Sequence, residues 1–154
     1  MAYPDISNGA YSVTANRQQI DVEAVHAFLT RSFWATGISR ELVAKSIAQS
    51  LCFGLFHRHL QVGFARVVTD SSTYAYLCDV YVLEEHRGKG LGKWMVDFVM
   101  KHPDLQGLRR FQLVTRDAHT LYSPFGFDAP ANPERHMEIF RPGLYSGTTS
   151  PEGF

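Results

Sequence analysis

Apolar residues recur at helical spacing in two segments near the start of the chain. The first segment predicts a helix that begins after Asp21, a residue type that caps helix N-termini, and runs to about Trp34. Its apolar stripe consists of Val22, Val25 and Leu29. The second helix is predicted to begin after Ser39, and its stripe consists of Leu42, Val43, Ile47 and Leu51. Residues Tyr11–Thr14 precede both helices and form a short candidate strand.

The middle of the chain has the patterns of strands. Leu51–Phe56 is apolar and aromatic, and a turn at Arg58 and His59 leads into a return strand. The alternating apolar positions of that strand are Leu60, Val62, Phe64 and Val68. The longest candidate strand, Thr73–Leu83, is apolar at both odd and even positions, which is typical of a strand buried on two faces.

The second half of the chain predicts a helix and then further short elements. The helix is marked by apolar residues at positions i, i+3, i+4, i+7 and i+8, namely Leu91, Trp94, Met95, Phe98 and Val99. Pro103 ends it, and Arg110–Thr115 is a strand. Ala118–Pro124 is helix-like, and closing strands are expected from Phe127 onward and at Met137–Phe140. The order predicts an α/β (α+β) fold with a mixed sheet, hairpins first and helical crossovers later.

Length and composition limit the classes of protein to which this chain can belong. Its 154 residues suit a single domain, 1–154, with an ordered core at about 11–143 and loose termini at 1–10 and 146–154. Lys and Arg number 15, as do Asp and Glu, so the formal charge is zero. Because proteins that bind nucleic acid or anionic membranes usually carry a basic excess, we expect neither as a partner.

Targeting and metal signals are weak. No apolar run approaches the roughly 20 residues that cross a bilayer, and no secretory signal is visible at the start. Cys52 and Cys78 lie in apolar runs without metal-ligand spacing, so we expect reduced thiols and a cytoplasmic protein. His57 and His59 have no third ligand nearby in sequence, and we predict no metal site.

The segment Val80–Lys93 carries the strongest chemical signal. A buried strand ends there, and a helix begins directly after a loop with three glycines, Gly88, Gly90 and Gly92. The first amides of a helix lack intrahelical partners and lie at the positive end of the helix dipole, which favours an anion. The loop also carries three cations, Arg87, Lys89 and Lys93. This combination predicts a pyrophosphate-binding loop.

Two nucleotide-binding motifs fit this loop poorly. A Walker A loop needs four residues between its two glycines, but Gly88 and Gly92 are separated by three, and Trp94 stands where Ser or Thr should follow the lysine. A dinucleotide fingerprint needs a third glycine where Lys93 stands.

The loop instead resembles the acyl-CoA-binding motif of the GNAT superfamily of N-acetyltransferases. That motif has Arg or Gln, then Gly, then Gly or Ala, and Arg87, Gly90 and Gly92 match it in register. A second element of the family, Ala, Leu-Tyr and Gly-Phe at fixed spacing, is matched by Ala118, Leu121, Tyr122, Gly126 and Phe127. The resemblance extends over about Tyr11 to Arg141.

The resemblance implies a fold, a cofactor and several roles. The fold is a mostly antiparallel central sheet of about six to seven strands, flanked by helices and splayed at a β-bulge around a slot for acetyl-CoA. The backbones of Val80, Tyr81 and Val82 would pair with the pantetheine arm. The pyrophosphate would be held by Arg87, Gly88, Lys89, Gly90, Leu91, Gly92 and Lys93. Tyr122 matches the tyrosine near the thioester sulfur, often the general acid, whereas the family's asparagine seven residues earlier is Thr115 here.

Two charged residues have alternative interpretations. Asp79 lies in the buried strand beside the expected cofactor contacts, so it is either the base or ammonium contact for the acceptor amine, or one half of an ion pair. Arg66 shares its strand face with apolar residues, so it either holds a substrate carboxylate or pairs with an acid such as Asp79.

Three aromatic residues, Phe33, Trp34 and Tyr76, either line the acceptor pocket or belong to the core. We expect an acetyl-CoA-dependent N-acetyltransferase that acts directly on the primary amine of a small molecule or amino-acid-like acceptor. The alternatives are a non-catalytic acyl-CoA-sensing module and acetylation of a protein amine. The apolar segment Met137–Phe140 leaves homodimerisation open.

Overall fold

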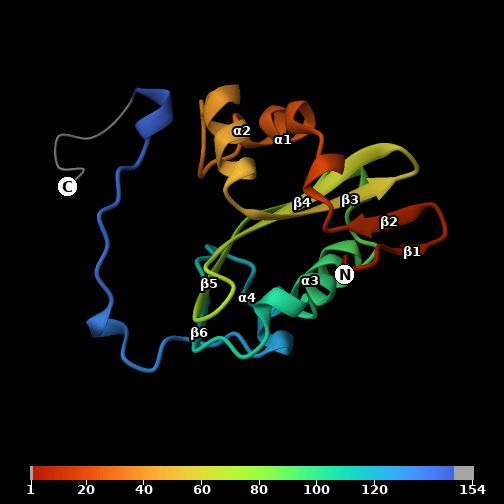
Figure 1. Ribbon diagram of the computed structural model, residues 1–154. Helices are drawn as coiled ribbons and strands as arrows, with labels where there is room; N and C mark the ends of the chain where they lie inside the picture. Colours follow the sequence, from red (N-terminus) through yellow and green to blue (C-terminus); the bar gives the residue numbers. More distant parts are fainter. Residues whose placement is uncertain (1, 148–154) are drawn as a thin grey trace.

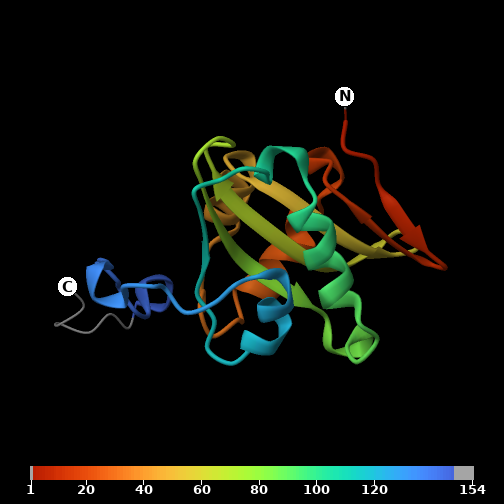
Figure 2. The same cartoon turned by 90° about the horizontal axis from the view of Figure 1, so that it is seen from below.

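A sheet with helices on both faces forms the body of the protein in the computed structural model, which describes residues 2–147 (Figures 1 and 2). The strands are β1 (Ile6–Asn8), β2 (Tyr11–Thr14), β3 (Leu51–His57), β4 (Leu60–Thr69), β5 (Tyr74–Val82) and β6 (Arg110–Leu113). The helices are α1 (Val22–Leu29), α2 (Arg40–Ala48), α3 (Leu91–Met100) and α4 (His119–Tyr122). The predicted fold class is confirmed.

The six strands within residues 2–147 lie in the sheet in the same order as in the chain. β1 to β5 are antiparallel neighbours, and β6 pairs with β5 in parallel after the α3 crossover. This last pairing spans only Tyr74–Leu77 of β5, opposite Arg110–Leu113. Beyond Leu77 the two strands separate, as the predicted splay requires, and β5 continues to Val82 without β6 beside it.

Each face of the sheet is covered by its own helices. Figure 1 shows α1 and α2 on one face and α3 and α4 on the other. The core under α1 and α2 includes Val25, Leu29, Val43, Ile47, Cys52, Phe64 and Tyr81. The core under α3 includes Phe53, Leu55, Val67, Met95, Val96, Phe98 and Val99. Burying such side chains contributes roughly 1.5–3 kcal/mol each, so the two cores hold the helices against the sheet.

The beginning of the chain is more ordered than predicted. Residues 1–10 were expected to be loose, but β1 forms a hairpin with β2 through a two-residue connection at Gly9 and Ala10. Glycine at the first position of a two-residue loop is typical of such hairpins, and Gly9 has φ 61° there. The hydroxyl of Tyr3 also donates to the carbonyl of Phe98 at 2.8 Å, which fixes the chain start on α3.

Two other predicted boundaries are wrong. The first helix ends at Leu29 instead of Trp34, because the chain continues in tight turns, such as the bond from the Ser32 amide to the Leu29 carbonyl. The closing strands expected from Phe127 onward and at Met137–Phe140 are absent from the described residues, where the chain leaves the sheet as an exposed segment and the outer edge of β6 has no strand beside it.

Residues 128–147, called here the C-terminal arm, are all exposed. Figure 1 shows the arm (blue) leaving the body near β6 and ending on the side of α2. The loose terminus predicted at 146–154 falls mainly on residues 148–154, which lie outside the described residues.

Candidate functional site

A β-bulge in β5 opens the site. Phe64 of β4 pairs with Tyr81 and Arg66 with Cys78, so that two residues of β5, Asp79 and Val80, lie opposite one residue of β4. Asp79 has φ 55°, a left-handed conformation that a non-glycine residue adopts at a cost of about 1–2 kcal/mol. Bulges bend a strand and redirect a side chain, and this one lies just where β5 leaves β6.

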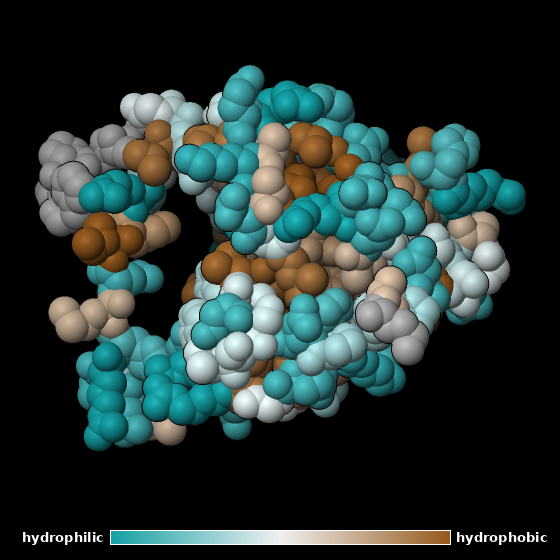
Figure 3. All heavy atoms as spheres, viewed as in Figure 1, coloured by the Kyte–Doolittle hydropathy of each residue, from teal (hydrophilic) through white to brown (hydrophobic). Residues whose placement is uncertain are grey.

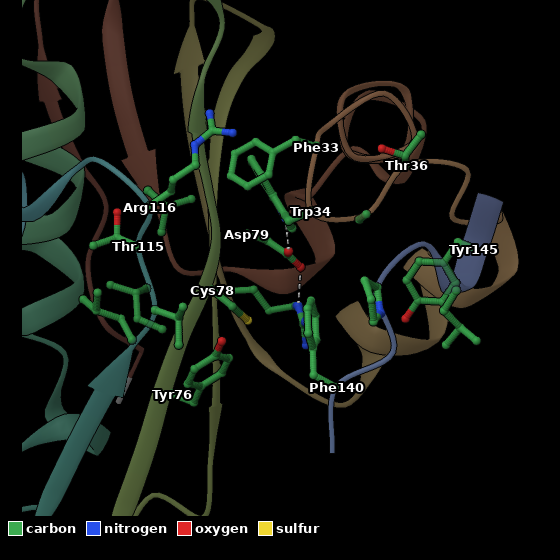
Figure 4. A pocket seen from close by; sticks show the side chains of 18 of the residues that line it. Phe33, Trp34, Thr36, Tyr76, Cys78, Asp79, Thr115, Arg116, Phe140 and Tyr145 are labelled. Atoms are coloured by element: carbon green, nitrogen blue, oxygen red, sulfur yellow. Dashed lines mark hydrogen bonds and ion pairs between the residues drawn. The ribbon is translucent and has the colours of Figure 1, made fainter. Parts of the chain in front are cut away.

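Asp79 holds an ion pair and a hydrogen bond at the bulge. Its Oδ2 accepts from Nε of Arg66 at 2.9 Å, and its Oδ1 accepts from Nε1 of Trp34 at 2.9 Å (Figure 4). Arg66 also donates from Nη1 to the Ser50 hydroxyl at 3.0 Å. The side chains of Arg66 and Asp79 are 18% and 11% exposed, so solvent screens the pair only partly. The ion pair offered by the sequence as one alternative is therefore present.

The bulge borders a cavity of about 1060 Å³. It is lined by β4, β5, the chain after β6, the turns after α1 and part of the C-terminal arm. Seven residues that the sequence singled out meet there: Phe33, Trp34, Arg66, Tyr76, Asp79, Val80 and Tyr122. Phe33 is 60% and Trp34 41% exposed, so these two belong to the cavity wall and not to the core. Figure 4 shows side chains from both walls around the cavity.

Part of the cavity wall was not predicted from the sequence. The guanidinium of Arg116 lies 3.8 Å from the centre of the Phe33 ring, a cation–π contact between segments 83 residues apart. The opposite wall comes from the arm, including Phe140 and Tyr145. No motif marks Arg116, and the apolar pattern at Met137–Phe140 predicted a strand, so the sequence did not place either segment at the cavity.

The predicted pyrophosphate loop is open at its helix end. Gly88 and Gly90 have φ 79° and 75°, values that favour glycine, and no atom lies within 4 Å of where a Cβ would stand. Gly90 is the N-cap of α3 and supplies no side-chain cap, so the first amides of that helix are left for a ligand. The two lysines, Lys89 and Lys93, are exposed beside it, whereas Leu91 is buried. Open amides, glycines and nearby cations are the features that a pyrophosphate-binding loop requires.

The free edge of β5 presents backbone and little side chain. The ring of Tyr81 stacks on Phe28, with ring centres 3.8 Å apart, and burial raises the pKa of Tyr81. Its phenol therefore belongs to the core under α1. Arg87 donates from Nε to the Val82 carbonyl at 2.8 Å, which fixes the loop against the strand end and occupies that carbonyl.

Tyr122 is the last residue of α4 and lines the cavity. It is 8% exposed, and burial raises the pKa of Tyr122 to about 12. The phenol thus stays protonated at neutral pH, as a proton donor must. Thr115 uses its Oγ1 locally, accepting from the Ala118 amide at 2.9 Å in the turn that leads into α4.

No group of three His, Cys, Asp and Glu side chains in residues 2–147 is arranged to hold a metal ion. The helices of the same residues are all too short or too polar to cross a membrane.

Comparisons with known proteins agree with this geometry. Residues 48–129 match the acetyltransferase (GNAT) domain family. The protein FG08082 of Gibberella zeae, whose name assigns it to the acetyltransferases, is 32% identical over 139 residues, which cover 75% of this chain and 77% of that protein.

Solved structures show the same relationship. A GNAT-family protein from Xanthomonas campestris pv. campestris is 50% identical and superposes with a TM-score of 0.86 over 88% of this chain and 96% of its own. A Clostridium acetobutylicum protein crystallised with acetyl-CoA shares the fold, with 15% identity and a TM-score of 0.59 over 83% of this chain and 98% of its own.

Proposed function

Because the chain belongs to the GNAT family of acetyltransferases, we propose that it moves the acetyl group of acetyl-CoA directly to the primary amine of a small, amino-acid-like acceptor. The observation that carries the proposal is the position of Tyr122 and Asp79 in one cavity, at the point where β5 leaves β6. A proton donor and a carboxylate are the two groups that this transfer needs.

GNAT acetyltransferases use acetyl-CoA, which supplies an acetyl thioester. In our proposal the pyrophosphate lies in the loop from Arg87 to Lys93, against the first amides of α3. Arg87 keeps further N–H donors for a phosphate beside the one that it gives to Val82. The pantetheine amides run along the backbone of Val80–Val82, and the amide near Val82 faces the negative charge that develops on the carbonyl oxygen.

Tyr122 donates the proton that the departing sulfur needs. The amine nitrogen bonds to the carbonyl carbon, the carbon–sulfur bond breaks, and the phenol proton passes to the sulfur. The extra proton on the new amide nitrogen then passes through water to the phenolate, which restores Tyr122. A phenol with a pKa of about 12 is fully protonated at neutral pH before each turnover.

Asp79 receives the acceptor amine. A carboxylate has about four lone-pair sites, and Arg66 and Trp34 use two of them. The remaining sites accept from the acceptor's ammonium group and take its proton, directly or through water. Arg66 donates to Asp79 and Ser50, so the role that we assign to it is to position Asp79.

Transfer is direct and does not pass through a cysteine. Cys78 lines the cavity, but burial raises the pKa of its thiol to about 12, so it is not a thiolate nucleophile at neutral pH. Both cysteines are free, which suits a reducing compartment, and we place the protein in the cytoplasm.

The cavity favours a small acceptor over a protein tail. Its volume of about 1060 Å³ is at the upper end of small-molecule sites, and the arm bounds it on the side away from β5. The rings of Trp34 and Tyr76 suit a cationic amine with an apolar or aromatic part, whereas Phe33 already holds the guanidinium of Arg116.

The test is coenzyme A release from acetyl-CoA across a panel of small amines and basic peptides, with calorimetric titration of acetyl-CoA beside it. We expect binding in the micromolar range and release with a subset of the small amines. No binding at millimolar acetyl-CoA overturns the proposal. Binding without release for any amine supports the alternative of an acyl-CoA-sensing module, and release with peptides alone makes the acceptor a protein.

A further inference from the structure

The acceptor cavity carries opposite charges on different walls. Asp79 lies on β5, and Arg116 lies in the chain after β6. Trp34 donates to Asp79 at 2.9 Å, and its ring meets the Phe33 ring edge to face, with ring centres 5.0 Å apart. The guanidinium of Arg116 lies against Phe33, as Figure 4 shows. The cavity therefore has an anion at one end of an aromatic pair and a cation at the other end.

The N–H groups of Arg116 are available for a ligand. Its distance of 3.8 Å from the Phe33 ring centre is typical of a guanidinium stacked on a ring, which leaves the N–H donors at the edge of the guanidinium plane. Within residues 2–147 the guanidinium donates no hydrogen bond, and its charged partner there is Asp117, with Nη2 and Oδ2 3.7 Å apart. Both side chains are largely exposed, at 64% and 74%, so solvent screens this pair and it is weak.

The other cations on the cavity wall are less suited to a substrate anion. Arg66 donates to Asp79 and to Ser50. Arg141 belongs to the exposed C-terminal arm, and not to the body that carries Asp79. Arg116 is therefore the cation that contacts within the body hold in a fixed position relative to Asp79.

We propose that the acceptor is an amino acid whose amine lies against Asp79 and whose carboxylate is bound by Arg116. This inference rests on the proposed function, since it concerns the acceptor of the same transfer. A carboxylate fits the edge of a guanidinium with two parallel hydrogen bonds. Two aromatic rings separate Asp79 from Arg116, so the carboxylate lies several bonds from the amine, as in an ω-amino acid.

The cavity is open to such a molecule. Figure 3 shows an opening between the body and the C-terminal arm, the two parts whose residues line the cavity, with apolar atoms at its edge. The cavity wall also includes Tyr76 and the 43% exposed Val68, which suit the methylene groups between the two charges. A molecule that is charged at both ends and apolar between them matches this distribution.

The first experiment compares amines that differ only in the anionic group. Coenzyme A release is measured with straight-chain amino acids of increasing length, with the amide of each acid, and with the aminoalkylphosphonate of the same length. We expect kcat/KM for the best acid to exceed that of its amide about 10-fold, because a charge-assisted hydrogen bond at a partly exposed arginine contributes about that factor. Equal values for acid and amide across the series overturn the inference and leave the proposed function in place. A phosphonate better than every acid would replace the amino acid by a phosphorylated amine.

The second experiment changes the protein. Arg116→Gln should lower kcat/KM for the acid about 10-fold and leave the value for the amide nearly unchanged, since the amide has no charge to pair. Asp117→Asn removes a competing carboxylate and should raise the value for the acid about twofold. The matched control is Arg109→Gln, at an exposed arginine directly before β6. A second control is Lys45→Gln, at an exposed lysine that lines a smaller cavity of about 470 Å³ beside Trp34. Equal losses for acid and amide in Arg116→Gln, or a loss specific to the acid in Lys45→Gln, overturn the inference.

Binding is also measured without turnover, so that the proposed function and the role of Arg116 can fail separately. The acid is titrated calorimetrically onto the protein in the presence of coenzyme A, which lacks the acetyl group. We expect the dissociation constant of the acid to rise about 10-fold in Arg116→Gln and that of the amide to stay the same. If no amine releases coenzyme A, the proposed function fails, but an acid affinity that depends on Arg116 still supports the carboxylate site. No binding at millimolar acid, or an affinity that does not depend on Arg116, overturns it.

Discussion

The proposed cofactor end and the proposed acceptor end of the site are made of different parts of the chain. At the cofactor end, the loop before α3 and the free edge of β5 present backbone amides, glycines and exposed cations within residues 80–93. At the acceptor end, the cavity is walled by side chains from the turns after α1, from β4 and β5, from the chain after β6 and from the arm.

This difference separates what the two ends can recognise. Backbone amides at a helix start select a pyrophosphate by charge and shape and do not depend on neighbouring side chains. Side chains from distant segments can be exchanged one at a time, so the acceptor can change while the cofactor end stays the same. Substitutions at the two ends should therefore give separable effects.

The largest expected effect is at the cofactor end. Gly90→Asp places a carboxylate at the N-cap of α3, where it repels the pyrophosphate. Asp tolerates a positive φ and caps helices well, so the variant should fold. We expect the dissociation constant of acetyl-CoA to rise about 100-fold, roughly 2.7 kcal/mol, in calorimetric titration.

The matched control is Gly107→Asp. Gly107 also has a positive φ, 70°, and open space around its Cβ position, but it lies in the exposed loop before β6. It accepts the same backbone strain without facing the cofactor. Equal losses of affinity in the two variants would mean that the loop before α3 does not hold the pyrophosphate.

Tyr122→Phe should give the next largest effect and leave the cofactor end intact. We expect kcat to fall about 100-fold while the acetyl-CoA dissociation constant changes less than twofold, because only the proton donor is lost. Burial raises the pKa of Tyr122 to about 12, so wild-type kcat should not decline through deprotonation of this phenol below pH 10. A Phe variant with full kcat would remove Tyr122 from the mechanism. Tyr3→Phe, which loses only a bond to Phe98, is the control.

The cofactor end could be predicted from the sequence because its parts are contiguous. A strand, three glycines, three cations and a helix within fourteen residues fix one another's positions. The structure has the strand, the loop and the helix as expected, and the binding of the cofactor there stays a prediction. The β-bulge was expected only through the resemblance to the family. Its position at Asp79 and Val80 depends on the register of β4 against β5, which no local pattern records.

The acceptor end could be predicted only in part. The strand face of Arg66 and its need for a partner pointed to Asp79, and the pair is present. Arg116 contacts Phe33, and Phe140 lines the opposite wall of the cavity. These segments lie far apart in the sequence, and hydrophobic periodicity does not predict contacts between distant loops. Met137–Phe140 was predicted as a closing strand, but the described residues have no strand there, although the outer edge of β6 is unpaired.

Asp79→Asn tests the acceptor end directly, with a smaller expected effect. The amide oxygen can still accept from Trp34, but the negative charge that receives the ammonium and pairs with Arg66 is lost. We expect kcat/KM for the amine to fall about 30-fold with unchanged acetyl-CoA affinity. In the companion variant Trp34→Phe the ring stays and the donor to Asp79 is lost, and about a threefold fall is expected. If Asp79→Asn lowers only the melting temperature, the carboxylate is a purely structural partner of Arg66.

The smallest expected effect is on the stability of the protein and changes neither the cofactor end nor the acceptor end of the site. His102 follows α3 at the end remote from the pyrophosphate loop, and its Nδ1 accepts from the Asp104 amide at 3.1 Å. Burial lowers the pKa of His102, so the neutral ring is the folded form. As pH falls below about 6.5, the unfolded chain takes up a proton before the folded chain does, and stability must decrease.

We therefore expect the urea midpoint of the wild type to fall between pH 7.5 and pH 5.5, and that fall to be smaller in His102→Asn. Asn keeps an acceptor for the Asp104 amide and cannot titrate, although it gives up ring contacts with Tyr3 and Phe53 and should be less stable at every pH. His119→Asn, at an exposed histidine, controls for the loss of a histidine as such. Because His102 lies away from both ends of the site, its variant should keep wild-type acetyl-CoA affinity and kcat at pH 7.5. A loss of acetyl-CoA affinity or of kcat in this variant would show that α3 transmits changes from its C-terminal end to the proposed pyrophosphate loop. Substitutions in the core would then change the function of the site as well as the stability of the protein.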